Sequence, residues 1–309
     1  MHQAAVIDCL RPGATELKPA SHELCHRVRP EDAFALGWTE LAKDRFLVRV
    51  GWPTSHPFFA PVHGGIHDPL LIVETMRQST MAVLHAGYGI PLDHHFLLTE
   101  LEYVYHPEGF EVGGPEDRAD LEITFSDLVH RGRNLSHLTV DWVIRRDCRT
   151  VATGGGRARL ISPGVYRRLR GGRDTPVSFR PQTHAADAAL VGRSRPEDVL
   201  LSPTPANGLW ELRPDTEHPT LFQRPSDHIP GMLLFEAARQ AAAAAVAPVP
   251  FLPARGSIVF HQYAEFDSPC LVEAVPVPAR EHGTSTLEVT GHQAGAPLFH
   301  CTFTTPLSF

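Results

Sequence analysis

The sequence predicts an α+β fold built from two diverged copies of one unit, each a long helix packed on an antiparallel sheet. Three observations predict it. A group of residues recurs at constant spacing, each copy has one strongly apolar helix, and strands with alternating side chains follow each helix. Because a buried helix and the sheet after it have to cover each other's apolar surfaces, each copy is expected to form two layers around one core.

The repeat is defined by residues that recur 162 positions apart. They are His56-Pro57 with His218-Pro219, Glu74 with Glu236, Arg77 with Arg239, and Gln78 with Gln240. Upstream, Arg29-Pro30-Glu31-Asp32 returns as Arg195-Pro196-Glu197-Asp198 at an offset of 166, so a loop in the second copy is shorter. The offsets predict an N-terminal extension over residues 1–25, a first repeat over 26–162, a linker over 163–192 and a second repeat over 193–309.

The first repeat is expected to begin with a strand over 46–50 and to continue with its helix. Asp68 followed by Pro69 predicts the helix start, because aspartate caps free amides and proline at the first helical position lacks only an amide that would stay unpaired. The helix runs to about Tyr88, and its apolar residues fall on every side of the helical wheel, which indicates a buried helix. Strands with alternating apolar side chains follow near 96–105, 121–128, 138–145 and 150–161.

The second repeat has the same order of elements. Its helix is expected from about residue 230 to 246 and is apolar apart from the recurring polar residues. Strands are expected at 209–213, 257–266, 271–277, 286–293 and 298–304. The linker between the repeats is rich in Pro, Gly, Arg and Ala without periodicity, which is typical of a segment that runs over the surface.

Each helix carries a glutamate, an arginine and a glutamine on one face, since the spacing i, i+3, i+4 brings three side chains together. In the simplest reading each Glu–Arg pair is an intrahelical ion pair at a partly solvated position, worth about 0–1 kcal/mol. On a buried helix such a pair stabilises a core no better than apolar residues do. Its double occurrence therefore favours a functional site at Glu74, Arg77 and Gln78, and at Glu236, Arg239 and Gln240.

The start of the second helix is a candidate oxyanion site. Free backbone amides and the helix dipole at this end stabilise a developing negative charge. Gly231 after Pro230 leaves the amides of Gly231 and Met232 open to a ligand. His228, just before them, is either a hydrogen-bond donor or base, or a polar cap of the helix.

Composition excludes several classes of function. A net charge of −7 over 309 residues provides no basic surface for a nucleic-acid backbone, so nucleic acid is not expected as a partner. No apolar run reaches the roughly 18 residues that span a bilayer. The first 25 residues lack the apolar core of a secretory signal, so a cytoplasmic protein without membrane contact is predicted. Gly64-Gly65 interrupt the grouping of His63, His67 and Asp68, and no metal is predicted.

Several segments resemble known families. The segment Asp227-His228-Ile229-Pro230-Gly231-Met232-Leu233-Leu234-Phe235-Glu236 resembles the helix of hot-dog acyl-carrier-protein dehydratases, although Phe222 stands where those enzymes have their catalytic histidine. The longer match is to the AfsA family, the A-factor (γ-butyrolactone) biosynthesis proteins of filamentous actinobacteria. It is carried by His56-Pro57-Phe58-Phe59-Ala60-Pro61-Val62, His67-Asp68-Pro69-Leu70-Leu71, Met76-Arg77-Gln78, His85-Ala86-Gly87-Tyr88-Gly89-Ile90-Pro91 and His218-Pro219-Thr220-Leu221-Phe222.

This resemblance implies a double hot-dog fold, in which each tandem repeat wraps an antiparallel sheet around a long central helix. One such unit leaves a sheet edge uncovered, so the repeats are expected to pack as a pseudo-dimer with joined sheets. The resemblance also implies transfer of a β-ketoacyl group from acyl carrier protein to a hydroxyl of dihydroxyacetone phosphate. The ester then closes to a butenolide phosphate, which other enzymes convert into an autoregulator. The family's helical Glu and Arg fall on Glu74, Arg77, Glu236 and Arg239.

The residues suit this reaction on chemical grounds. An alcohol that attacks a thioester needs a base, an oxyanion site and a clamp for the phosphate. The prediction assigns these roles to Glu236 (with Glu74 as its counterpart), to the amides of Gly231 and Met232, and to Arg239 or Arg77. Gln78 and Gln240 share those helix faces and are expected to bind substrate. No Gly-x-Ser-x-Gly elbow is present, so direct transfer is favoured over a covalent acyl-enzyme. No cofactor is predicted.

Three alternatives stay open at this point. One alternative to the acyltransferase is a hot-dog thioesterase or hydratase, which needs only the carboxylate and the helix amides. Another is a non-catalytic acyl-binding regulatory module, since the fold alone does not imply activity. The stretch Arg167-Arg168-Leu169-Arg170 with Arg173 is either a solvated linker or a docking site for an acidic carrier protein. A monomeric pseudo-dimer and a homodimer both fit the repeat.

Overall fold

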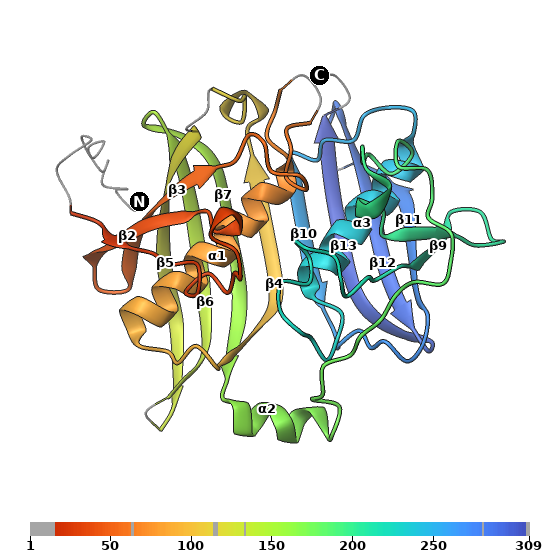
Figure 1. Ribbon diagram of the computed structural model, residues 1–309. Coiled ribbons are helices and arrows are strands. Elements are labelled where there is room, and N and C mark those ends of the chain that lie inside the picture. The colour runs from red at the N-terminus through yellow and green to blue at the C-terminus, as the bar shows by residue number, and fades with distance from the viewer. Residues whose placement is uncertain (1–15, 63–64, 114–116, 133, 280, 307–309) are drawn as a thin grey trace.

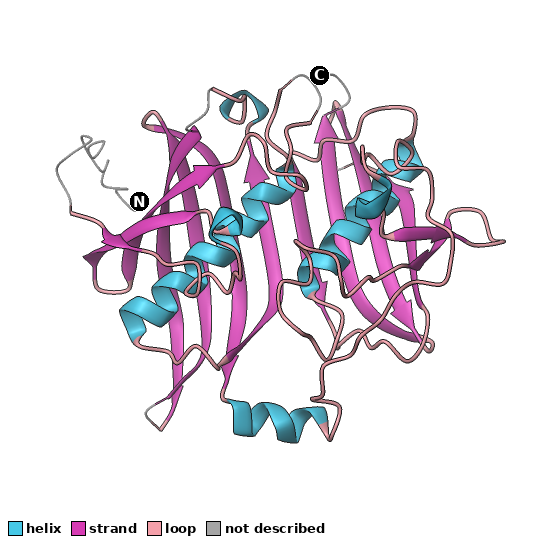
Figure 2. Ribbon diagram, viewed as in Figure 1, coloured by secondary structure: helices cyan, strands magenta, loops and turns pink. Residues whose placement is uncertain are grey.

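The computed structural model describes residues 16–62, 65–113, 117–132, 134–279 and 281–306. Its strands form one antiparallel sheet of 13 strands, and two long helices cover the same face of it, as Figures 1 and 2 show. The predicted α+β class and the hot-dog arrangement of helix and sheet are confirmed.

The first half of the chain contributes seven strands and one long helix. They are β1 (Lys18–Pro19), β2 (Ala35–Ala42), β3 (Arg45–Trp52), α1 (Pro69–Tyr88), β4 (His95–Tyr105), β5 (Asp117–Arg131), β6 (Asn134–Arg146) and β7 (Arg149–Ile161). The second half contributes α2 (Pro163–Arg170), β8 (Leu201–Pro203), β9 (Leu209–Leu212), α3 (Gly231–Val246), β10 (Arg255–Phe260), β11 (Cys270–Val277), β12 (Thr284–Gln293) and β13 (Ala296–Pro306). Short 3-10 turns lie at Pro30–Asp32, Pro107–Gly109 and Pro196–Asp198.

The two halves meet where β4 pairs antiparallel with β10, with Leu101 opposite Ile258. The strand order is β1-β2-β3-β5-β6-β7-β4-β10-β13-β12-β11-β9-β8. Counted outward from the central pair, β7 corresponds to β13, β6 to β12, β5 to β11, β3 to β9 and β2 to β8. The expected joining of the two sheets is therefore present, and this order is the one that a pseudo-dimer of two repeats would give.

Helix α1 has the ends that its sequence predicts. The Asp68 side chain accepts a hydrogen bond of 2.8 Å from the Leu70 amide, Pro69 follows the cap, and Gly89 ends the helix in the left-handed conformation with φ 67°. From Pro69 to His85 almost every residue is buried, because α1 packs on β2, β3 and β5 while other segments of the chain cover its outer side.

Helix α3 is shorter and differs at its start. Pro230 precedes it, and no side chain caps it. Burial is continuous from Leu233 to Ala243, where the helix packs mainly on β11 and β12. The first turn, in contrast, remains partly accessible.

Several elements differ from the prediction. The strand expected over 257–266 ends at Phe260, and the residues after it form a loop that packs beside the start of α3. The linker is not wholly irregular, because it contains α2. Strands β1, β2 and β8 were not predicted. No helix in the described part of the chain combines the length and apolar character that a membrane span requires.

Candidate active site

The glutamate of α3 lies at the centre of a buried ion-pair network. Glu236 is fully buried, and the Arg239 guanidinium donates to it twice, Nε to Oε2 at 2.7 Å and Nη2 to Oε1 at 2.8 Å. Arg193 donates from Nε to Oε1 at 2.7 Å and reaches the carboxylate of Asp68 at 3.1 Å with Nη1. Asp68 caps α1, so Arg193 links the two long helices.

The glutamate of α1 has the equivalent surroundings. Glu74 is 1% exposed and accepts hydrogen bonds from Arg77, Nε to Oε2 and Nη2 to Oε1, both at 2.9 Å. Arg27 also contacts this carboxylate. Arg27 and Arg193 occupy matching places in the two repeats and were missed in the sequence, although they have the same offset of 166 as the recurring Arg-Pro-Glu-Asp segments.

The two glutamines point to the backbone of the chain. Gln78 accepts from the Phe34 amide at 2.8 Å and donates to the Asp32 carbonyl at 2.8 Å and to Glu74 at 2.6 Å. Gln240 makes the corresponding contacts in the second repeat. Both amides are fully buried, and these bonds hold the 3-10 turn of each repeat against its helix.

The pKa of Glu236 reflects competing effects. Burial acts to raise it, but the charges and hydrogen bonds of Arg193 and Arg239 are stronger together and lower the pKa to about 2. With a pKa of about 2, the Glu236 carboxylate is ionised at neutral pH and is a weak base there. Its place in the structure is that of the counter-ion that holds two buried guanidinium groups.

Replacing Glu236 by glutamine is expected to lower the free energy of unfolding by about 3–5 kcal/mol, because the buried Arg239 loses its paired carboxylate and Arg193 keeps only Asp68. The matched variant Glu281→Gln removes an exposed partner of Arg255 and should change stability by less than about 1 kcal/mol. Since the folded-state pKa lies below the ordinary value of 4.5, the stabilisation is complete above pH 4.5 and disappears as pH falls through about 2. Denaturant unfolding between pH 7 and pH 2 measures both effects. An E236Q curve that runs parallel to wild type over this range would contradict the assignment.

A group of arginines near Glu74 carries more positive than negative charge. Arg77 keeps 28% of its side chain exposed, and burial lowers its pKa to about 10. Arg224 is exposed and has no hydrogen bond or ion pair among the described residues; burial and then the charge of Arg77 lower its pKa. Burial and the charges of Arg224 and Arg77 also lower the pKa of His26 to about 3. Arg27 adds a third guanidinium to the group. Glu74 pairs with Arg27 and Arg77, and Asp32 adds a negative charge near Arg27, so the described side chains leave Arg224 available to bind an anion.

The start of α3 is open, whereas the start of α1 is closed. In α1 the Asp68 side chain and carbonyl accept from the first amides, and the whole first turn is buried. In α3 the amides of Gly231 and Met232 have no acceptor within the part of the chain that the structure describes, and both residues are partly accessible. Of the described starts of the two long helices, that of α3 therefore presents free amides of the kind that stabilise an oxyanion, and that of α1 does not.

His228 lies immediately before these amides as one member of a histidine–aspartate pair. Its Nδ1 is 2.7 Å from Oδ1 of Asp227, and 24% of its side chain is exposed. A carboxylate only accepts hydrogen bonds, so Nδ1 carries a proton and Nε2 of the neutral ring keeps a free lone pair. Burial acts to raise the pKa of Asp227, but hydrogen bonds from His228, Tyr166 and Arg170 lower it, which keeps the carboxylate ionised.

Two tyrosines complete the surroundings of this pair. The Tyr166 hydroxyl donates to Asp227 at 2.8 Å and lies 3.2 Å from Nδ1 of His228. The Tyr263 ring stands edge-on to His228 with 4.8 Å between the ring centres, and its hydroxyl is buried without a partner among the described residues. Asp227, Tyr166 and Tyr263 were not predicted. Asp227 directly precedes His228 in the sequence, whereas only the fold brings Tyr166 of α2 and Tyr263 of the loop after β10 to the start of α3.

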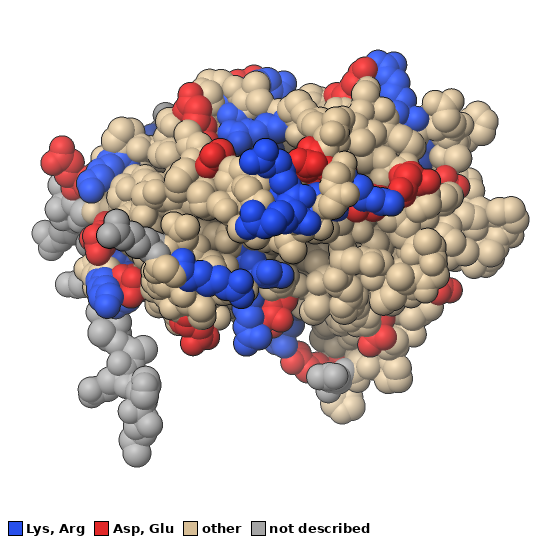
Figure 3. Space-filling model, turned by 90° about the horizontal axis from the view of Figure 1, so that it is seen from below, with Lys and Arg blue, Asp and Glu red and all other residues tan. Residues whose placement is uncertain are grey.

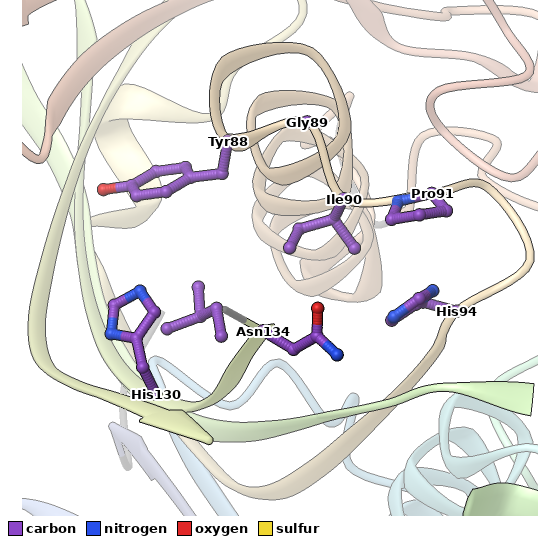
Figure 4. Close-up of a pocket in the computed structure, with 8 residues that line it drawn as sticks. Tyr88, Gly89, Ile90, Pro91, His94, His130 and Asn134 are labelled. Atoms are coloured by element: carbon purple, nitrogen blue, oxygen red, sulfur yellow. The ribbon is translucent and has the colours of Figure 1, made fainter. Parts of the chain in front are cut away.

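A pocket of about 130 Å³ lies elsewhere, at the C-terminal end of α1. Figure 4 shows Tyr88, His94, His130 and Asn134 around it, from the end of α1, the loop before β4, the end of β5 and the start of β6. No predicted site residue lines it. Its volume is well below the roughly 300–1,000 Å³ of ordinary ligand pockets, so no substrate is assigned to it.

The residues that resemble a metal set have other partners. His67 is fully buried, and its Nε2 lies 2.7 Å from Oδ2 of Asp117. Asp68 caps α1 and binds Arg193. His63 lies outside the described residues.

Comparison with known proteins gives consistent matches over most of the chain. A family model described as the A-factor biosynthesis hotdog domain, AfsA, matches residues 11–162 and 175–307. A 2-oxo-3-(phosphooxy)propyl 3-oxoalkanoate synthase of Streptomyces griseus is 49% identical over 295 residues, which cover 95% of this chain and 97% of that protein. Synthases of the same name from Streptomyces coelicolor and Streptomyces virginiae are 49% and 40% identical and cover 93% and 90% of this chain, and 92% and 95% of their own lengths.

Solved structures resemble the fold at much lower identity. An oleoyl thioesterase of Lactobacillus plantarum has a TM-score of 0.50 and 9% identity, covering 84% of this chain and 95% of that one. The 12:0-ACP thioesterase of Umbellularia californica has a TM-score of 0.50 and 12% identity, covering 84% and 97%. At such identities the likeness shows the fold alone.

Proposed function

Because the chain belongs to the AfsA family of A-factor biosynthesis hotdog proteins, we propose that it is an acyltransferase that makes a 2-oxo-3-(phosphooxy)propyl 3-oxoalkanoate. The acceptor is dihydroxyacetone phosphate and the donor is a β-ketoacyl thioester on acyl carrier protein. The observation that carries the proposal is the 49% identity to synthases of this product over 95% of the chain. The open start of α3 and the excess of arginines near Glu74 support it.

The proposed chemistry takes place at the start of α3. Nε2 of His228 accepts the proton of the acceptor hydroxyl while the oxygen attacks the thioester carbonyl. The amides of Gly231 and Met232 donate to the oxyanion of the tetrahedral intermediate. The C–S bond then breaks, the ester remains, and the proton passes from His228 to the departing thiolate. Asp227 holds the imidazole in the required tautomer.

Arg77 and Arg224 are proposed to bind the phosphate. Arg224 has no counter-ion among the described residues, and Arg77 is the more accessible of the two helical arginines, with 28% of its side chain exposed against 6% for Arg239. The loop that carries Arg224 continues directly to His228. The Cα atoms of Arg224 and His228 are therefore at most about 14 Å apart, which is compatible with one acceptor molecule contacting both.

The glutamates have a supporting role in this proposal. The sequence pattern favoured Glu236 as the base, with Glu74 as its counterpart. The structure shows both carboxylates buried and bonded to arginines. We assign to Glu74 the positioning of Arg77 and to Glu236 the positioning of Arg193 and Arg239. No electrons are transferred, so the proposed reaction includes no redox cofactor. Its donor is a product of cytoplasmic acyl metabolism, and we place the protein there.

We expect the purified protein to form the phosphorylated ester from a β-ketoacyl carrier-protein thioester and dihydroxyacetone phosphate. Mass spectrometry detects the products. Release of free β-ketoacid without ester would indicate a thioesterase. Binding of the thioester with no turnover would indicate an acyl-binding module. Hydration or dehydration of the acyl chain would indicate a hydratase.

A further inference from the structure

Helix α2 crosses one end of the molecule between the two repeats, at the bottom of Figure 1. Tyr166 and Arg170, one turn apart, are buried. Between them Arg167, Arg168 and Leu169 are exposed. Viewed from this end, basic side chains gather near the middle of the surface (Figure 3).

The inner side of α2 is fixed to the proposed active site. The Tyr166 ring stacks flat on His95 with 3.6 Å between the ring centres, and its hydroxyl bonds Asp227. Arg170 donates to Asp227 at 2.8 Å and to Glu265 at 2.7 Å, with 3% of its side chain exposed. Arg170 is therefore not part of a solvated linker, and α2 has a defined orientation beside the residues that precede α3.

The outer side of α2 carries charge and apolar surface without an internal function. Among the described residues, Arg167 and Arg168 have no carboxylate partner. Val165 is 38% exposed and Leu169 is 52% exposed. Basic residues in the last turn of a helix also interact favourably with the helix dipole. That interaction does not account for the exposed apolar side chains. Arg159, exposed near the end of β7, adds a further charge that has no ion-pair partner in the described part of the chain.

We propose that this outer side, formed by Val165, Arg167, Arg168 and Leu169, docks the acyl carrier protein that delivers the β-ketoacyl thioester. The inference rests on the proposed function and adds the surface that the donor uses. Carrier proteins are acidic, so the arginines provide charge complementarity, which steers association and fixes orientation. Tyr166 and Arg170 connect this helix to Asp227, beside His228, so a protein docked there stands next to the free amides of α3.

The test uses the double variant Arg167→Glu/Arg168→Glu in the full chain. Its control is Arg149→Glu/Arg255→Glu, which makes the same change in charge at two exposed sites. Arg149 begins β7 and Arg255 begins β10, whereas α2 follows the other end of β7. Fluorescence anisotropy measures the Kd for a labelled bacterial holo acyl carrier protein. Kinetics compare the β-ketoacyl carrier protein with the same acyl group on N-acetylcysteamine, a thiol that lacks the protein.

In the α2 variant the Kd and the KM for the carrier-bound donor are expected to rise at least about tenfold, since two attractive contacts become repulsive. Activity on the small thioester, the melting temperature and the control should match wild type. Wild-type binding should weaken as salt is raised. Unchanged carrier affinity, no wild-type binding, or equal loss with both donors would each overturn the docking proposal. Absence of ester formation by wild type with either donor would instead refute the proposed function, and the anisotropy measurement would still decide the docking.

Discussion

Replacing His228 by glutamine is expected to lower kcat for ester formation by about 10²- to 10⁴-fold, the usual contribution of a positioned general base. Nδ1 of His228 is committed to Asp227, so Nε2 is the lone pair that can accept the acceptor's proton. Glutamine keeps a polar side chain but has no basic nitrogen. The KM values of both substrates should change much less than kcat, because the ring does not bind the phosphate or the acyl chain.

The exposed histidine His292, on β12, provides the matched control, and His292→Gln should retain full activity. Thermal melts establish that both variants are folded. If H228Q is folded and as active as wild type, the proton is accepted elsewhere, and Glu236 or Glu74 returns as the candidate base. A loss confined to KM would make His228 a binding group.

The double variant Arg77→Lys/Arg224→Gln is expected to lose about 10²- to 10⁴-fold in kcat/KM for dihydroxyacetone phosphate. This corresponds to two charge-assisted contacts worth roughly 1.5–3 kcal/mol each. Lysine keeps a charge beside Glu74 but cannot form the planar bidentate contact with a phosphate. Unphosphorylated dihydroxyacetone should be a poor acceptor for wild type. The kcat/KM of the double variant for this compound should be about the same as that of wild type.

The same substitution in the other repeat separates binding from stability. Arg239→Lys changes an arginine that is 6% exposed and bound to Glu236 at 2.7 Å, so it should lower the melting temperature and leave the preference for the phosphorylated acceptor intact. If Arg239→Lys abolishes that preference and the Arg77/Arg224 variant keeps it, the phosphate site lies in the second repeat. Equal losses with both acceptors would show that Arg77 and Arg224 act through structure.

The elements that sequence could predict are those with local signals. Asp68-Pro69 and Pro230-Gly231 mark helix starts through backbone chemistry that needs no tertiary contact, and α1 and α3 begin within one residue of the expected positions. Alternation predicted the long strands of both halves. Strand β2 was missed because two register shifts interrupt its pairing, and β8 because it has only three residues.

The partners of the site residues could not be predicted in the same way. Helix α2 has eight residues, too few to be stable alone, and depends on contacts of Tyr166 and Arg170 with distant segments. The spacing rule correctly placed Glu236 beside Arg239 but gave no sign of Arg193, which comes from the start of the repeat. The additional hydrogen bond from Arg193 changes the role that the motif predicts for Glu236. A glutamate with one arginine could be a base, whereas one with two arginines is a counter-ion.

The difference between the capped start of α1 and the open start of α3 has a consequence for inheritance. In a homodimer of identical subunits every substitution appears twice, so a capping aspartate that closes one helix closes both. Here the two halves are written separately in one gene, and Asp68 has no aspartate at the corresponding place before α3, where Pro230 stands. Two repeats in one chain can therefore differ at this position, with a capped helix start in the first and an uncapped helix start in the second.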